Sequence, residues 1–219
     1  MAATNGTFQE LIGPEAWRSL LATGSLRSFQ PGRSILRQGE LGGFLFAVES
    51  GRVKLLASAA DGVQLVLTVR GGGHLIGELA GDSDGTRTAS VVAIDRCTAR
   101  FLTQADFDRF LYRHDLHGSF RRYVTGKFEQ AVGRQVDLAH RRAVRRISRL
   151  LLDLVRLAPD GLPDARYIPF TQEELATALG MARSTVTDQL SKLRESGALA
   201  PGRQLVVADV DRLAEWAES

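Results

Sequence analysis

The stretch TQEELATALGMARSTVTDQLSKLRESGAL, residues 171–199, predicts two short helices joined by a turn. Thr171 followed three residues later by Glu174 has the pattern of a capping box, which begins a helix. Gly180 supplies the conformational freedom that a tight turn needs. Apolar side chains recur at helical spacing on both sides of this glycine, namely Leu175, Ala178 and Leu179, then Val186, Leu190 and Leu193. The pattern is typical of a helix-turn-helix.

The segment after this motif predicts a wing. Gly197 ends the second helix, and ALAPGRQLVVAD (198–209) has two short apolar runs around a Pro-Gly turn. Two helices that pack for structural reasons alone are the alternative interpretation. The capping box, the turn glycine and the wing together favour a winged helix domain that binds DNA.

The second helix has polar side chains off its apolar stripe, where they would meet DNA. Arg183 can bind a guanine or a phosphate, and Asp188 can accept a hydrogen bond from a cytosine amino group. Lys192 and Arg203 are better placed for backbone phosphates. The expected DNA contacts are Gln172, Arg183, Ser184, Thr185, Thr187, Asp188, Lys192 and Arg203.

The first hundred residues have a different pattern, with short apolar runs separated by glycines. SILRQGE, FLFAVESGRVKLLAS and TASVVAIDRCTARFL are examples, and Asp61-Gly62 is a good hairpin turn. A short helix is expected at PEAWRSLL (14–21). Many short strands at even spacing predict an antiparallel sandwich or barrel.

Helical spacing begins at Gln104 and continues through a long segment. Between residues 116 and 139 the apolar positions are Phe120, Val124, Phe128, Ala131 and Leu138. A long apolar stripe outside a compact barrel needs a partner, so we expect dimerisation through this helix. The predicted protein is α+β, with a barrel domain (1–115), a dimerisation helix (116–140) and a winged helix-turn-helix domain (141–219).

Composition excludes several classes of protein. The chain has 219 residues, 44% hydrophobic and 24% charged, which is ordinary for a globular protein. Its one cysteine, Cys97, rules out an internal disulfide, a Cys-ligated iron–sulfur cluster and a zinc ribbon. No apolar run is long enough to span a membrane and no leader pattern is present, so we expect a cytoplasmic protein. Residues 121–149 hold nine Lys/Arg and two Asp/Glu, either a site for a polyanion or a solvated helix face.

The loop GELAGDSDGTRTAS (77–90) places a carboxylate, Glu78, and a guanidinium, Arg87, among small residues. The preceding glycines in GGGHLIGELAG lack the Gly-Lys-Ser/Thr ending of a phosphate-binding P-loop. No cluster of catalytic or metal-ligating residues is evident elsewhere. The sequence therefore predicts a binding site and no enzyme.

The chain resembles the CRP/FNR family of bacterial transcription regulators along nearly its whole length. The resemblance rests on PGRSILRQGE (31–40), LFAVESGRVKLL (45–56), LIGELA (75–80), RTAS (87–90) and the helix-turn-helix. It implies a jelly-roll-like cyclic-nucleotide-binding barrel and a homodimer that binds a palindromic operator. It also implies contact with RNA polymerase, and no membrane.

The resemblance assigns a ligand site to the loop. Arg87 would bind the phosphate of cAMP or cGMP, Thr88 would add a hydrogen bond to it, and Glu78 would accept from the ribose 2′-hydroxyl. The implied site comprises Gly77, Glu78, Leu79, Ala80, Arg87, Thr88 and Ala89. The alternative is an effector-independent regulator, in which a Glu78–Arg87 ion pair closes an empty loop and the barrel serves only dimerisation.

Several positions depart from the family pattern. Ala131 and Val132 stand where the cyclic-AMP-receptor type has hydroxyl residues that meet the adenine, so cyclic GMP, another nucleotide or no ligand remain open. Thr88 is the residue type associated with cyclic GMP preference in some related domains. Leu79 stands where the haem type needs an axial ligand, and His74 is expected to be packed or solvated, so no haem is expected.

The second helix of the helix-turn-helix, which would read the DNA bases and is called the recognition helix below, also departs from the family pattern. The family's common pattern there is Arg-Glu-Thr-Val followed by another Arg, whereas residues 183–188 read RSTVTD. The missing glutamate and second arginine predict an operator unlike that of the cyclic-AMP receptor.

Overall fold

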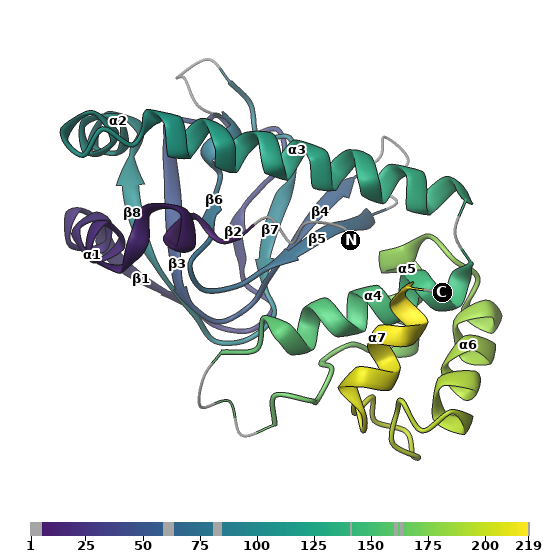
Figure 1. The fold of residues 1–219 in the computed structure, drawn as a ribbon. Coiled ribbons are helices and arrows are strands. Elements are labelled where there is room, and N and C mark those ends of the chain that lie inside the picture. The colour runs from purple at the N-terminus through teal and green to yellow at the C-terminus, as the bar shows by residue number, and fades with distance from the viewer. Residues whose placement is uncertain are drawn as a thin grey trace.

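The computed structural model describes residues 6–58, 64–80, 85–140, 142–159, 162 and 164–218, with the backbone alone for 134–140. A β-barrel occupies the N-terminal half, and one long helix runs from the barrel to a C-terminal group of helices (Figure 1). The hairpin turn expected at Asp61-Gly62 lies outside the described residues. No described helix is both long and apolar enough to cross a membrane.

The barrel consists of two four-stranded antiparallel sheets. One sheet has the order β1-β8-β3-β6 and the other the order β2-β7-β4-β5. The strands are β1 (Ser25–Phe29), β2 (Ser34–Leu36), β3 (Phe44–Ser50), β4 (Val53–Ser58), β5 (Gln64–Arg70), β6 (Leu75–Ile76), β7 (Ser90–Ala93) and β8 (Cys97–Thr103). Apart from the β4–β5 hairpin, strands that follow one another in the chain are not paired, as in a jelly roll. The predicted antiparallel barrel is therefore confirmed.

Three helices pack against the first sheet through an aromatic cluster. They are α1 (Phe8–Thr23), α2 (Gln104–Arg113) and the first half of α3 (His117–His140). The ring of Phe8 lies 6.1 Å from those of Phe107 and Phe120 and 5.3 Å from that of Tyr123. The expected short leading helix is thus part of a longer one, which kinks at Gly13 (φ 81°), directly before Pro14.

The C-terminal domain contains the predicted helix-turn-helix. Its helices are α4 (Ala143–Arg156), α5 (Gln172–Leu179), α6 (Arg183–Glu195) and α7 (Val210–Glu218). Thr171 and Glu174 form the capping box, and Gly180 adopts the left-handed conformation (φ 59°) that ends α5. Leu175, Val186 and Leu190 lie in the shared core. The predicted winged helix is confirmed.

The wing is more minimal than the sequence suggests. The two expected strands meet only at an isolated bridge between Leu199 and Val207. A third segment joins them, because Tyr167 bridges to Val206. The wing thus draws on the connection before the helix-turn-helix, whose apolar residues Ile168 and Phe170 are buried in the same core.

A buried arginine joins the barrel to the C-terminal domain. The side chain of Arg52, which directly precedes β4, donates two hydrogen bonds to the Asp95 carboxylate at 2.6 and 2.9 Å. Its third bond, at 2.6 Å, goes to the carbonyl oxygen of Leu154 in the last turn of α4. A cation at a helix C-terminus also interacts favourably with the helix dipole. Arg52 therefore fixes the end of α4 against the barrel.

Replacement of Arg52 tests this contact. We expect Arg52→Met to lower the free energy of unfolding by about 3–5 kcal/mol, because it leaves a largely buried carboxylate without its partner. The control is Arg109→Met, which removes an exposed ion pair with Asp106 and should cost less than about 1 kcal/mol. Chemical denaturation measures both, and equal losses would contradict the role given to Arg52.

Candidate functional site

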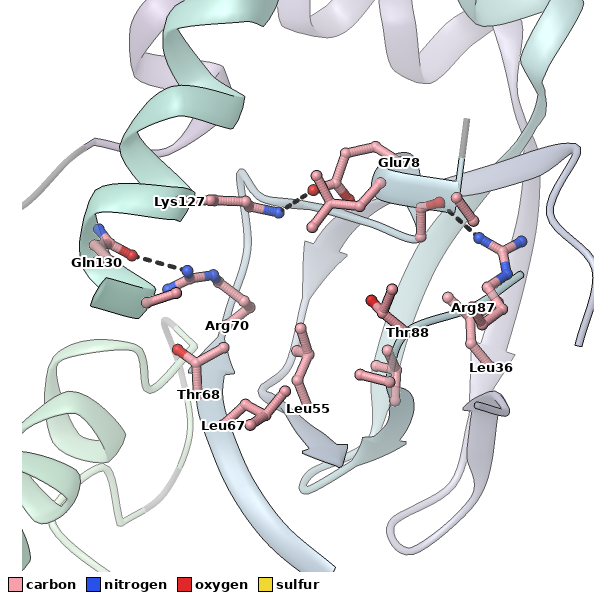
Figure 2. Close-up of a pocket in the computed structure, with 16 residues that line it drawn as sticks. Leu36, Leu55, Leu67, Thr68, Arg70, Glu78, Arg87, Thr88, Lys127 and Gln130 are labelled. Carbon is pink, nitrogen blue, oxygen red and sulfur yellow. Dashed lines mark hydrogen bonds and ion pairs between the residues drawn. The ribbon is translucent and has the colours of Figure 1, made fainter. Parts of the chain in front are cut away.

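A pocket of about 160 Å³ opens between the second sheet, the turn after β6 and the middle of α3 (Figure 2). Residues on the barrel and on α3 contribute to it. The lining comprises Leu36, Leu55, Leu67, Thr68, Arg70, Gly77, Glu78, Leu79, Ala80, Arg87, Thr88, Ala89, Val91, Lys127, Gln130 and Ala131. The seven loop residues of the implied ligand site thus all line one cavity.

The turn that follows β6 requires a glycine. Gly77 has a φ of 88°, and a Cβ atom there would lie 2.5 Å from Nη1 of Arg87 and 2.9 Å from Leu36. The chain then forms a 3₁₀ turn over Glu78–Ala80. The absence of a side chain at Gly77 lets the Arg87 guanidinium lie directly against the turn.

Arg87 is held in place by carbonyl oxygens and an aromatic ring. Its guanidinium donates to the carbonyl oxygens of Gly77 at 2.6 Å and Phe44 at 2.7 Å, and lies 4.5 Å from the Phe44 ring centroid. The residue is only 4% exposed, and its Nε–H has no acceptor among the described residues. Burial lowers the pKa of Arg87, but arginine stays protonated in proteins. The pocket wall therefore carries a positive charge that the surrounding carbonyl oxygens and the Phe44 ring hold in place.

Glu78 pairs with a lysine from α3. Its Oε1 lies 2.6 Å from Nζ of Lys127, which also donates to the carbonyl oxygen of Leu75 at 2.8 Å. Burial lowers the pKa of Lys127, and the Glu78 carboxylate opposes that effect. The considered Glu78–Arg87 ion pair is not formed, because the two side chains have different partners.

Polar residues at positions i, i+4 and i+7 of α3 enter the barrel together. Tyr123 accepts from the Leu75 amide at 2.9 Å, Lys127 binds Glu78, and Gln130 accepts from Nη2 of Arg70 at 2.8 Å. This spacing puts them on one helix face. Sequence reasoning missed Thr68, Arg70, Lys127 and Gln130; the i, i+4, i+7 spacing is the signal that identifies two of them.

The two α3 positions expected to meet a base differ in their placement. Ala131 lines the pocket, whereas Val132 does not and is 45% exposed. Successive helical residues are about 100° apart, so the two side chains point in different directions.

The expected DNA contacts lie mostly on the surface. Arg183, Ser184, Thr187, Asp188, Lys192 and Arg203 are exposed, and Thr185 and Gln172 are half-buried. Thr187 donates to Gln172 at 3.1 Å, which ties the start of α5 to α6. Arg183, Ser184, Thr185, Thr187, Asp188 and Lys192 lie on α6, the second helix of the motif, whereas Gln172 begins α5 and Arg203 lies in the wing.

Cys97 and His74, the residues that could be considered for thiol or metal chemistry, are both buried. Burial raises the pKa of the Cys97 thiol to about 12, and Asp95 contributes, so the thiol is unreactive. His74 lies 3.3 Å from the Tyr123 hydroxyl, and burial, with Arg70 and Lys127, lowers its pKa well below 6.5. Within the described ranges no group of three potential metal ligands occurs.

Comparisons with known proteins match both halves of the chain. Residues 26–114 match the cyclic nucleotide-binding domain, and residues 145–216 match the Crp-like helix-turn-helix domain. The cyclic AMP receptor protein of Thermus thermophilus is 29% identical over 87% of this chain and 88% of its own. The CRP-like cAMP-activated global transcriptional regulator of Mycobacterium tuberculosis is 26% identical over 98% and 97%.

A solved structure of similar fold supports the same family assignment. A transcriptional regulator of the CRP/FNR family from Thermus thermophilus has a TM-score of 0.69 and 27% identity, covering 89% of this chain and 99% of that one. The full-length relatives are thus transcription regulators, which points away from an enzyme.

The buried imidazole of His74 predicts a pH dependence of stability. It is neutral in the folded protein, whereas in the unfolded chain it binds a proton as the pH falls through about 6.5. Protons therefore favour unfolding below that pH, with a slope of up to about 1.4 kcal/mol per pH unit. Denaturation between pH 7 and pH 5 should show a shallower slope for His74→Gln than for the unmodified protein. The exposed His117→Gln is the control, and an unchanged slope in His74→Gln would contradict the assignment.

Proposed function

This chain belongs to the CRP/FNR family of bacterial transcription regulators, and we propose that a cyclic nucleotide, cAMP or cGMP, bound in its barrel controls its binding to DNA. The main support is Arg87, a buried guanidinium in the wall of a pocket whose described hydrogen bonds go to carbonyl oxygens and not to a carboxylate. A phosphodiester anion supplies the negative charge that these partners lack.

The other groups of the loop suit a cyclic nucleotide. Glu78 is an acceptor beside the pocket and can bind the ribose 2′-hydroxyl, while Lys127 keeps its charge balanced. Thr88 lines the cavity, and its hydroxyl has no hydrogen-bond partner among the described residues. Both full-length relatives carry names that describe a response to cAMP, which supports the same class of ligand here.

Control of DNA binding would pass through α3. Glu78 and Lys127 form a largely buried contact between the ligand loop and this helix, so a ligand that engages Glu78 acts on α3 directly. The other end of α3 leads into α4 and the helix-turn-helix (Figure 1). A ligand shifts such an equilibrium only by its difference in affinity for the two states, commonly about 1–3 kcal/mol.

The DNA-binding state is proposed to be a homodimer. Phe128 is 69% exposed and Val132 lies one turn further on the same side of α3. A second copy that packs α3 against α3 would cover this apolar surface. Two recognition helices about one DNA turn apart then bind a palindromic operator, whose sequence can be obtained by selection from random DNA. Contact with RNA polymerase is expected from the family.

One observation favours the effector-independent alternative. Arg87, Glu78 and Arg70 each have a protein partner, so the protein itself supplies hydrogen bonds to these charged groups. In that case the barrel would serve only dimerisation, and no nucleotide would bind.

Calorimetric titration with cAMP and cGMP decides between control by a cyclic nucleotide and the effector-independent alternative. We expect at least one nucleotide to bind, and Arg87→Ala to weaken it by about 10- to 100-fold through loss of charged hydrogen bonds. Thr88→Ala, at an exposed site, should cost about 3- to 10-fold, which keeps the test valid if Arg87→Ala folds poorly. The exposed Arg33→Ala serves as the control. Absence of binding to the unmodified protein would overturn the proposal.

Dimerisation is tested by a charge in the apolar surface of α3. Phe128→Arg should halve the mass measured by light scattering and weaken DNA binding, since two linked half-sites bind more tightly than one. Tyr112→Arg, at an aromatic residue of α2 that is even more exposed, should change neither quantity. A Phe128→Arg protein that stays dimeric would exclude this surface as the interface.

A further inference from the structure

A second arginine lies in the pocket, on the opposite side from Arg87 (Figure 2). Arg70, at the end of β5, is 8% exposed, and its Nη2 donates to Oε1 of Gln130 at 2.8 Å. Its only other described bond is a long one, 3.5 Å from Nη1 to the carbonyl oxygen of the adjacent Val69. Its Nε–H is buried and has no partner among the described residues.

The groups between the two arginines are mainly apolar. Leu36, Leu55, Leu67 and Val91 belong to the lining, and Leu55 and Thr88 lie between the two guanidinium groups in Figure 2. A ligand that satisfies both ends therefore has an anion at Arg87, a body that packs against these apolar side chains, and hydrogen-bond acceptors at Arg70. A nucleotide with its phosphate at Arg87 directs its base toward Arg70.

The hydrogen-bond donors of the Arg70 guanidinium distinguish guanine from adenine. Guanine presents two adjacent acceptors, O6 and N7, which an arginine binds in a bidentate manner. Adenine presents N7 beside its 6-amino group, so an N–H donor of Arg70 would face another N–H donor. Ala131 lines the same region and offers no hydroxyl that would favour adenine.

We propose that Arg70, positioned by Gln130, reads the O6/N7 edge of guanine, so that the pocket prefers cyclic GMP to cyclic AMP. This inference rests on the proposed function, because it names the base of the nucleotide whose phosphate meets Arg87. Gln130 is a positioning residue: its carbonyl holds Nη2 and leaves the rest of the guanidinium to the base.

The test is calorimetric titration of the full-length protein with cyclic GMP, cyclic AMP and cyclic IMP. The unmodified protein should bind cyclic GMP at least about 10-fold more tightly than cyclic AMP. Cyclic IMP keeps O6 and N7 but lacks the 2-amino group, and it should bind within a few-fold of cyclic GMP. Arg70→Leu should lower the affinity for cyclic GMP and cyclic IMP while it changes that for cyclic AMP little.

The outcomes separate this inference from the proposed function. Equal or tighter binding of cyclic AMP would overturn the guanine preference and leave the nucleotide site intact. An equal loss for all three nucleotides in Arg70→Leu would show a general role for Arg70 and overturn base reading. Tighter binding of cyclic di-GMP than of cyclic GMP would overturn the mononucleotide assignment. If no nucleotide binds, the proposed function fails and this inference fails with it.

Gln130→Leu provides a second variant, since it removes the partner of Arg70 at the edge of the pocket. It should reduce the ratio of cyclic GMP to cyclic AMP affinity by about 3- to 10-fold while retaining binding of both. An unchanged ratio would contradict the positioning role.

Discussion

The arrangement of the molecule depends on the contact between the polar face of α3 and the barrel. Tyr123 and Lys127 are largely buried and Gln130 is half-buried, and each meets a partner on the barrel: the Leu75 backbone, the Glu78 carboxylate and the Arg70 guanidinium. Buried polar groups are costly unless they are paired, so the helix can dock only in the register that satisfies all three. The same requirement couples α3 to the loop that holds Glu78, and α3 leads directly to the helix-turn-helix.

The side chains that line the pocket carry more positive than negative charge. Among the described lining residues three are cationic, Arg70, Arg87 and Lys127, against the one carboxylate of Glu78. Burial lowers the pKa of Arg70, Arg87 and Lys127, which reflects the cost of keeping these groups charged there. An anionic ligand would reduce that cost, and the proposed ligand binding would thereby be linked energetically to the docking of α3. Arg52 also fixes the end of α4 against the barrel.

Features encoded over a few neighbouring residues were predictable from the sequence. The capping box at Thr171, the turn at Gly180 and the Gly77–Ala80 turn each follow from local backbone requirements, and the glycine-separated runs indicated the barrel. Arg70 and Lys127 were not identified, because their partners lie 60 and 49 residues away in the chain; the helical spacing of Lys127 with Tyr123 and Gln130 marks a shared face but does not show what that face meets. Lys127 was counted in a basic segment, although its ammonium is largely buried. Val132 was grouped with Ala131, yet one step along a helix turns the side chain away from the pocket.

The most direct test of the account is a linkage measurement between nucleotide and DNA. Operator affinity is measured with and without saturating nucleotide, and nucleotide affinity with and without saturating operator. If the pocket controls DNA binding through α3, each ligand strengthens the other by the same factor, about 5- to 150-fold. A nucleotide that binds but leaves operator affinity unchanged would show that the pocket and the helix-turn-helix are not coupled, and would contradict the account.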